Sequence, residues 1–410
     1  MDSESVMARL RAAGAEDSRD RDRLCERAAK VYLDEKLEPP FTVRSADFAT
    51  DAFLICADRY WRLRFLAEPS VRTAAACAVW LTSHVEAEHR QAVEEKLALG
   101  FGFITRDTVD TDAALTQAAA QVAQLGTGAS DVAFFVAVYH AGKLRGNFWF
   151  DALYDFTSWH RLVELAGERA TDPVLTALKA FGALGSRRIT TEHALGLVHD
   201  AWSSPRRSRA VTDVCLNGLS AASPFDTQGT ELRDRAKEAV AVLPDDHGMW
   251  YWLAYGQHLC AEHEAACVSI DKALALLPAV GGRGSHELLQ EQYRRRRDMI
   301  QDGRRHAEML AARERRWGQR YPELPEHPST AQLADEPTRE ANHAPLAWGA
   351  AVSATFVAVI AAASRSVALG DMTLGERLGA VSALWGISAG TVVLVLVVLG
   401  LLRRRRDVPR

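Results

Sequence analysis

The chain has 410 residues, of which 48% are hydrophobic and 25% are charged. These proportions are those of a globular protein and exclude a wholly disordered or collagen-like chain, while a mean hydropathy of −0.13 excludes a protein built mostly of membrane spans. Residues 346–410 hold seven Arg and three acids, which leaves 42 basic and 50 acidic residues and a net charge of −8 in residues 1–345. That acidic balance makes nucleic-acid binding unlikely for the body of the chain.

Residues 1–209 are predicted to form a helical N-terminal domain in the cytoplasm. The first residues lack the apolar segment of a secretory signal, and six Cys are scattered singly without a CxxC pair. Apolar residues at spacings of three and four predict Arg62–Glu68, two helices within Val71–Leu99, Ala113–Leu125, Asp131–Ala141, Leu144–Leu153, Pro173–Leu184 and Thr191–Trp202. Clustered aromatic and β-branched residues leave short strands as alternatives at Phe101–Thr105 and Val132–Tyr139.

Residues 210–320 carry the clearest helical pattern. In Met249–Pro278 two short helices are predicted to meet near Ala261. The residues expected to pack this pair are Trp250, Leu253, Ala254, Ala266, Ile270, Ala273 and Pro278. The pattern resembles a tetratricopeptide (TPR) repeat, with Gln257 in place of the usual tyrosine and Ala261 in place of the turn glycine.

The resemblance extends over residues 210–320 and loosely to Phe134–Phe156, where Gly142 is expected to be the turn between two helices. A degenerate preceding repeat is indicated by Leu216, Leu219, Ala236, Ala239 and Pro244. Because one repeat buries its apolar face only against its neighbours, the resemblance implies an all-α helical-repeat array with a concave surface for a protein partner.

A long helix is predicted over Ser285–Arg320. An apolar stripe runs through Leu289, Tyr293, Ile300, Ala307, Leu310 and Trp317. Ten Arg and six acids cover the rest of the helix, which favours a solvated surface with pairs of opposite charge one turn apart. Contact with an anionic membrane leaflet and contact with nucleic acid are the alternatives.

Residues 321–345 are predicted to be a Pro-rich acidic linker, because five Pro prevent a stable helix. Residues 346–363 and 378–402 are predicted transmembrane helices: 18 and 25 residues without a charge make roughly 27 and 37 Å of helix, against a hydrocarbon core of about 30 Å. A buried core helix is the alternative for each. Residues 364–377 would then form an extracytoplasmic loop.

Residues 403–410 form a basic tail that sets the predicted orientation. It carries Arg403, Arg404, Arg405 and Arg406, and positive charge beside a span stays in the cytoplasm. Two spans therefore place both termini in the cytoplasm. Small residues recur along one face of each span at Ala350, Ala354, Ala358, Ala362, Ser382, Gly386 and Gly390. They are expected to pack the hairpin, and the second span is also a candidate contact for a homo-oligomer.

Several patterns come close to known catalytic or metal sites, and each lacks a required part. Gly386–Gly390 matches G-x-S-x-G but lies in an apolar segment, HVEAEH at 84–89 is not HExxH, and Gly281–Gly284 precedes no Lys-Ser/Thr. His193, His199 and Asp200 have no nucleophile nearby. The group His258, Cys260, Glu262, His263 and Cys267 falls on two helices and their connection. We therefore expect no catalytic residue, no cofactor and no metal.

The sequence thus predicts a membrane-anchored scaffold that recruits a cytoplasmic protein partner. Its architecture is similar to that of TPR membrane proteins associated with bacterial conflict and defence loci. Two alternatives remain. The hairpin could oligomerise and perturb the bilayer when the body senses a signal, or residues 30–200 could contain an enzyme.

Overall fold

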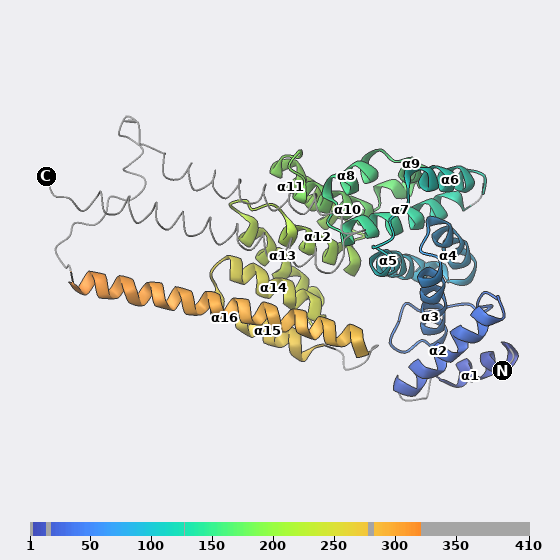
Figure 1. Cartoon of the computed structure of the whole chain (residues 1–410), viewed down its shortest axis with the longest axis horizontal. Helices are drawn as coiled ribbons and strands as arrows, with labels where there is room; N and C mark the ends of the chain where they lie inside the picture. The colour runs from blue at the N-terminus through green and yellow to red at the C-terminus, as the bar shows by residue number, and fades with distance from the viewer. Residues whose placement is uncertain (1–2, 14–17, 127, 278–282, 321–410) are drawn as a thin grey trace, which may run out of the picture. The chain divides into compact units, whose positions relative to one another are not determined.

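The computed structural model describes residues 3–13, 18–126, 128–277 and 283–320, which belong to one compact unit (Figure 1). Across these ranges the fold is all-α, with an isolated bridge between Val43 and Val85 and no strand. None of the described helices is both long and apolar enough to span a bilayer. The predicted linker, spans, loop and tail all lie outside the described residues.

The described part of the chain contains sixteen α-helices and one 3₁₀ helix. They are α1 (Ser3–Ala12), α2 (Ser18–Asp34), α3 (Ala52–Ala67), α4 (Val71–His84), α5 (Ala87–Ile104), α6 (Asp112–Ala123), α7 (Ala129–Gly146), α8 (Phe150–Trp159), α9 (Arg161–Leu165), η2 (Gly167–Thr171), α10 (Pro173–Gly185), α11 (Thr191–Trp202), α12 (Arg209–Ala221), α13 (Gln228–Val242), α14 (His247–Leu259), α15 (His263–Ala275) and α16 (Arg283–Arg320).

Helix α7 is the centre of the first half of this array. It contacts α4, α5, α6, α8, α9 and α10, and every residue from Val132 to Leu144 is buried. A helix that is packed on all sides is apolar on all sides. Its nearest neighbour is α5, where the backbones of Gly102 and Gly142 meet.

The predicted helix Asp131–Ala141 is part of α7, and the alternative of a strand at Val132–Tyr139 is wrong. The aromatic and β-branched residues of this segment are there because the helix is enclosed. Gly142 is not a turn but lies inside α7, where a Cβ atom would come within 3.6 Å of the Cα atom of Gly102. The predicted helix Leu144–Leu153 is accordingly split, since α7 ends at Gly146 and α8 begins at Phe150.

The alternative of a strand at Phe101–Thr105 is also wrong, because α5 continues through Ile104. The buried Phe101 ring stacks on Phe65 of α3, with 4.6 Å between ring centroids. Helix α3 is longer than predicted because it starts at Ala52, where the Asp51 side chain accepts hydrogen bonds from the N–H groups of the first turn.

A buried ion pair holds α7 to the loop before α6 and to the start of α4. The Lys143 ammonium has no exposed surface and donates to Asp110 Oδ2 at 2.8 Å. It also donates to the carbonyl oxygens of Pro69 and Thr108, at 2.9 and 2.7 Å. The second oxygen of Asp110 accepts from the N–H group of Val71 at 2.9 Å. One cation therefore satisfies acceptors from two loops.

From α10 onward the helices follow one another as a stacked array. The successive pairs α10/α11, α12/α13 and α14/α15 each contact the next pair, and α16 packs on α14 and α15. This is the contact pattern of a helical array, in which each unit buries its apolar face on its neighbours. The predicted division at residue 210 stays a prediction.

Only the first half of α16 packs on the array. Tyr293 stacks on Tyr251 with 4.5 Å between centroids, and the Arg296 guanidinium lies 3.7 Å from the centroid of the Tyr255 ring. Ile300 is fully buried, whereas every side chain from Arg305 to Ala311 is exposed. Beyond Gly303 the helix therefore runs past α14 and α15 (Figure 1).

Candidate functional site

A groove of about 840 Å³ lies between α5, α7, α12 and the start of α16. Its volume is within the range of ligand-binding clefts. The residues that line it include Phe48, Glu95, Lys96, Gly100, Phe103, Arg145, Phe148, Ser208, Arg209, Asp213, Asn217 and Gln292. We call this cavity the central groove.

A buried carboxyl joins two walls of the central groove. Glu95 of α5 is 1% exposed and accepts hydrogen bonds from Ser208 Oγ at 2.5 Å and from Gln91 Nε2 at 2.9 Å. Burial raises the pKa of Glu95. Ser208 also caps α12, because its Oγ accepts from the N–H group of Val211 at 3.2 Å. The contact between α5 and α12 therefore depends on residues 113 positions apart.

Lys96 and Arg209 are two cations that line the groove. Lys96 of α5 lies 3.7 Å from the centroid of the Phe48 ring, and no carboxylate among the described residues forms an ion pair with it. Partial burial lowers the pKa of Lys96, the charge of Asp58 partly offsets this, and the charge of Arg209 at the start of α12 lowers it. Arg209 donates to Asp246 Oδ2 at 2.6 Å. Neighbouring like charges of this kind favour an anionic ligand.

The back wall of the groove is a fixed polar network. Arg145 of α7 donates to Asp213 at 3.1 Å and to Asn217 at 2.9 Å, both on α12. The Trp252 indole N–H of α14 donates to the other oxygen of Asp213 at 3.0 Å. These bonds connect three helices, so the wall keeps its shape without a ligand.

Aromatic rings stand at the rim. Phe103 and Phe148 are each 55% exposed, although large aromatic side chains are usually buried. Phe148 follows the end of α7 with φ +55°, a left-handed conformation that favours glycine and is unusual for a bulky residue. An exposed ring held in an unfavourable backbone conformation is a sign of a functional surface.

Gly100 has no role in the packing of the fold. It lies inside α5, where glycine is less stable than alanine by about 0.5–1 kcal/mol. A Cβ atom at this position would meet no atom within 4 Å, so no neighbour requires the absence of a side chain. What glycine does preserve is open space along the groove floor.

The residues predicted to pack the repeat lie in the α14–α15 pair. Leu253, Ala254, Ala266, Ile270 and Ala273 are buried. Trp250 is partly buried and its indole N–H donates to the carbonyl of Pro244 at 2.7 Å, while Pro278 lies outside the described residues. Gln257 accepts a buried hydrogen bond from Ser269 at 2.7 Å, and Ala261 turns the chain with φ +60°.

Within the cluster around residue 260 the structure brings two histidines together. The Nδ1 atoms of His258 and His263 lie 3.3 Å apart, and Gly303 of α16 lies against both rings. A Cβ atom on Gly303 would come within 2.7 Å of His258 Cε1. The Glu262 carboxylate accepts a hydrogen bond from Arg233 Nη1 at 2.6 Å. The pair is thus a contact between α16 and the α14–α15 turn.

Protonation of His258 is expected to weaken the docking of α16. Burial lowers the pKa of His258, as do the neighbouring His263 and Arg296. The unfolded state, with a histidine pKa of about 6.5, therefore binds the proton first, and stability is lost as the pH falls below that value. Between about pH 8 and 5, residues 1–320 should lose more stability towards denaturant than the His258→Gln variant does. Equal pH dependence of the two proteins would contradict this.

Of the other sequence patterns, the described residues bring one group together. Glu86, Glu88 and His89 bring their ligand atoms within 4.8 Å of one another, but on an exposed surface where Arg44 already pairs with Glu86 at 3.3 Å. His84 turns away and stacks on Trp80. His193 on α11 contacts Tyr154. The segment Gly281–Gly284 lies partly outside the described residues. Gly386–Gly390 and the residues predicted to pack the spans lie entirely outside them.

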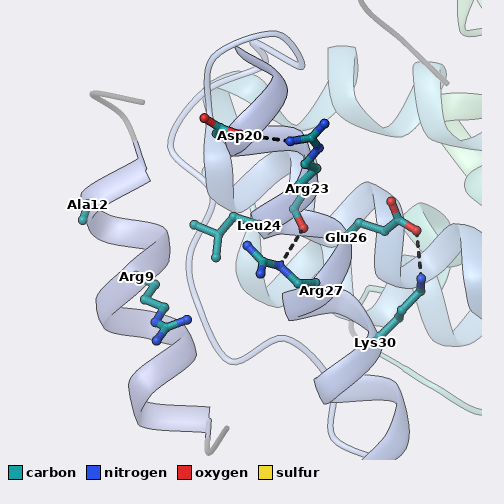
Figure 2. A pocket seen from close by; sticks show the side chains of 8 residues that line it. All are labelled: Arg9, Ala12, Asp20, Arg23, Leu24, Glu26, Arg27 and Lys30. Atoms are coloured by element: carbon teal, nitrogen blue, oxygen red, sulfur yellow. Dashed lines mark hydrogen bonds and ion pairs between the residues drawn. The ribbon is translucent and has the colours of Figure 1, made fainter. Parts of the chain in front are cut away.

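A second cavity of about 940 Å³ lies between α1 and α2 (Figure 2). It is lined by Arg9, Ala12, Asp20, Arg23, Leu24, Glu26, Arg27 and Lys30. Two of its cations are already paired along α2, Arg23 with Asp20 at 3.4 Å and Lys30 with Glu26 at 2.9 Å. The other two cations, Arg9 and Arg27, form no ion pair among the described residues.

Comparison with protein-family models, with curated proteins and with solved structures gave no match to this chain.

Proposed function

We propose that this protein is a scaffold that binds an extended acidic segment of a partner protein in the central groove and holds that partner at a membrane. The observation that carries the proposal is Lys96, which forms no ion pair among the described residues, together with the open space at Gly100 in the same groove. A carboxylate between Lys96 and Arg209 would relieve the repulsion of these two charges. Apolar side chains of the segment would contact the rim at Phe103 and Phe148.

Two further features support this proposal. The resemblance of residues 210–320 to TPR repeats favours protein binding, because the concave surface of such arrays is a common binding surface. The uncharged segments 346–363 and 378–402 are long enough to anchor the scaffold in a bilayer.

Binding explains the groove better than catalysis does. Its lining, as described, contains neither His nor Cys. The Ser208 hydroxyl donates to Glu95 and its oxygen also caps α12, so attack by this oxygen would break the helix cap. For the alternative of an enzyme in residues 30–200, Glu95 is the buried carboxyl that lines this space.

A peptide-display selection on residues 1–320 tests the groove. We expect wild type to enrich acidic peptides, and Gly100→Leu to lose them, because the new side chain fills the groove floor. Gly100→Ala is the matched control and should keep most of the binding, because a single methyl group occupies little of the groove. Lys96→Glu should shift the selection away from acidic peptides. Identical selections by wild type and Gly100→Leu would refute the proposed site.

A further inference from the structure

The second half of α16 carries a stripe of cations that the array does not use. Residues 304–316 contain five Arg and two Glu, a net charge of +3 in a body whose total is negative. Arg305, Met309, Arg313 and Arg316 recur at intervals of four, four and three residues, which places them on one face of the helix. We call this face the distal stripe.

The distal stripe points away from the rest of the fold. Met309 follows the buried Ile300 by nine residues, about two and a half helical turns, so the two side chains are on opposite sides of α16. Met309 is 63% exposed, although it is apolar. The acids of this half-helix, Glu308 and Glu314, lie off the stripe.

Few charges on the stripe are neutralised within the protein. Arg305 pairs with Asp302 one turn earlier. Arg316 donates to the carbonyl of Ala312 at 3.3 Å in its own helix, and no carboxylate of the described residues pairs with Arg313 or Arg316. The stripe is therefore open to an external anion.

We propose that the distal stripe lies on the anionic headgroups of the membrane, with the Met309 side chain dipping between them. The proposal rests on the membrane attachment proposed above. From Arg320 the chain needs only 25 residues to reach the first uncharged segment, at most roughly 80 Å when extended. Attached there, the stripe meets a negative surface at high local concentration. Nucleic acid fits less well, since the remainder of the body would repel it.

The test replaces the natural anchor, so that it does not depend on the predicted spans. Residues 1–320 with a C-terminal histidine tag are tethered to vesicles that contain nickel-chelating lipid. A fluorophore is placed at Met309→Cys in a background of Cys260→Ser and Cys267→Ser, the two partly exposed native thiols. A short-range quencher is attached to the lipid headgroups. The vesicles are phosphatidylcholine alone or with phosphatidylglycerol.

We expect quenching on phosphatidylglycerol vesicles and its loss at high salt. Each arginine removed should weaken the contact about fivefold, so Arg305→Gln with Arg313→Gln and Arg316→Gln should weaken it on the order of a hundredfold. The control exchanges Arg23, Arg27 and Lys30 of α2 for Gln and should leave quenching unchanged, because these cations lie at the α1–α2 cavity (Figure 2).

Three results would overturn the proposal. The first is quenching on neutral vesicles equal to that on anionic vesicles. The second is a loss of quenching in the α2 control as large as in the distal-stripe variant. The third is movement of the labelled protein from anionic vesicles to added duplex DNA. Failure of the full chain to stay in membranes would count against the proposed anchor alone.

Discussion

Replacement of Lys143 by Met is expected to destabilise the fold by about 3–5 kcal/mol, because removal of one partner leaves the other charge buried and unpaired. In this protein the groups that lose their cation would be the Asp110 carboxylate, 5% exposed and then left with His140 Nδ1 at 3.7 Å, and the carbonyl oxygens of Pro69 and Thr108. Denaturant unfolding of residues 1–320 measures the loss. The effect should be global, since α7 contacts most of the first half of the array.

Two further variants separate the loss of the buried ion pair from a general loss of positive charge. Lys30→Met removes an exposed lysine whose pair with Glu26 is worth at most about 1 kcal/mol. Combining Lys143→Met with Asp110→Asn should destabilise less than the sum of the two single changes, because no charge is then left alone. Additive losses would show that Lys143 and Asp110 do not act as a pair.

Replacement of Gly102 by Ala is the second change with a large expected effect. The added Cβ atom would lie 2.5 Å from the carbonyl oxygen of Tyr139 and 3.1 Å from the backbone of Gly142, so α5 and α7 must move apart. Overpacking of this kind costs about 1–3 kcal/mol. Unfolding curves of the variant should shift accordingly.

Gly100→Ala is the matched control, two residues earlier in the same helix. Its Cβ atom meets nothing within 4 Å, so alanine should stabilise α5 by about 0.5–1 kcal/mol. A loss of stability in Gly102→Ala together with a gain in Gly100→Ala would show that Gly102 is needed for helix packing and that Gly100 is not. Destabilisation by Gly100→Ala would remove the argument that this glycine is kept for a ligand.

The sequence was sufficient to predict an all-α array and its most amphipathic elements. The predicted helix Ser285–Arg320 is α16, which begins at Arg283. Periodicity failed where a helix is enclosed: α7 has no polar face, so Val132–Tyr139 could not be told from a buried strand. The glycine at 142 was misread as a turn for the same reason, because the approaching backbone of α5 is not visible from local sequence.

The central groove could not be predicted from local patterns. Its walls are joined by Glu95 and Ser208, which are 113 residues apart, and the role of Lys96 depends on Arg209, which lines the same groove. Gly100 gave no signal, because it directly follows the predicted helical stretch Val71–Leu99, where a glycine is a common helix end. The exposed ring of Phe148 was not a signal, because its left-handed backbone is a property of the folded chain.

Photo-crosslinking from position 103 of the full chain in intact cells tests the central claim most directly. A crosslinking aromatic amino acid fits there because the Phe103 ring is 55% exposed at the rim of the groove, and the space at Gly100 stays open. We predict one main adduct, recovered with the membranes, whose crosslinked peptide is acidic and which disappears when Lys96 is changed to Glu. Absence of an adduct, or an adduct found only in the soluble fraction, would contradict the membrane-held scaffold.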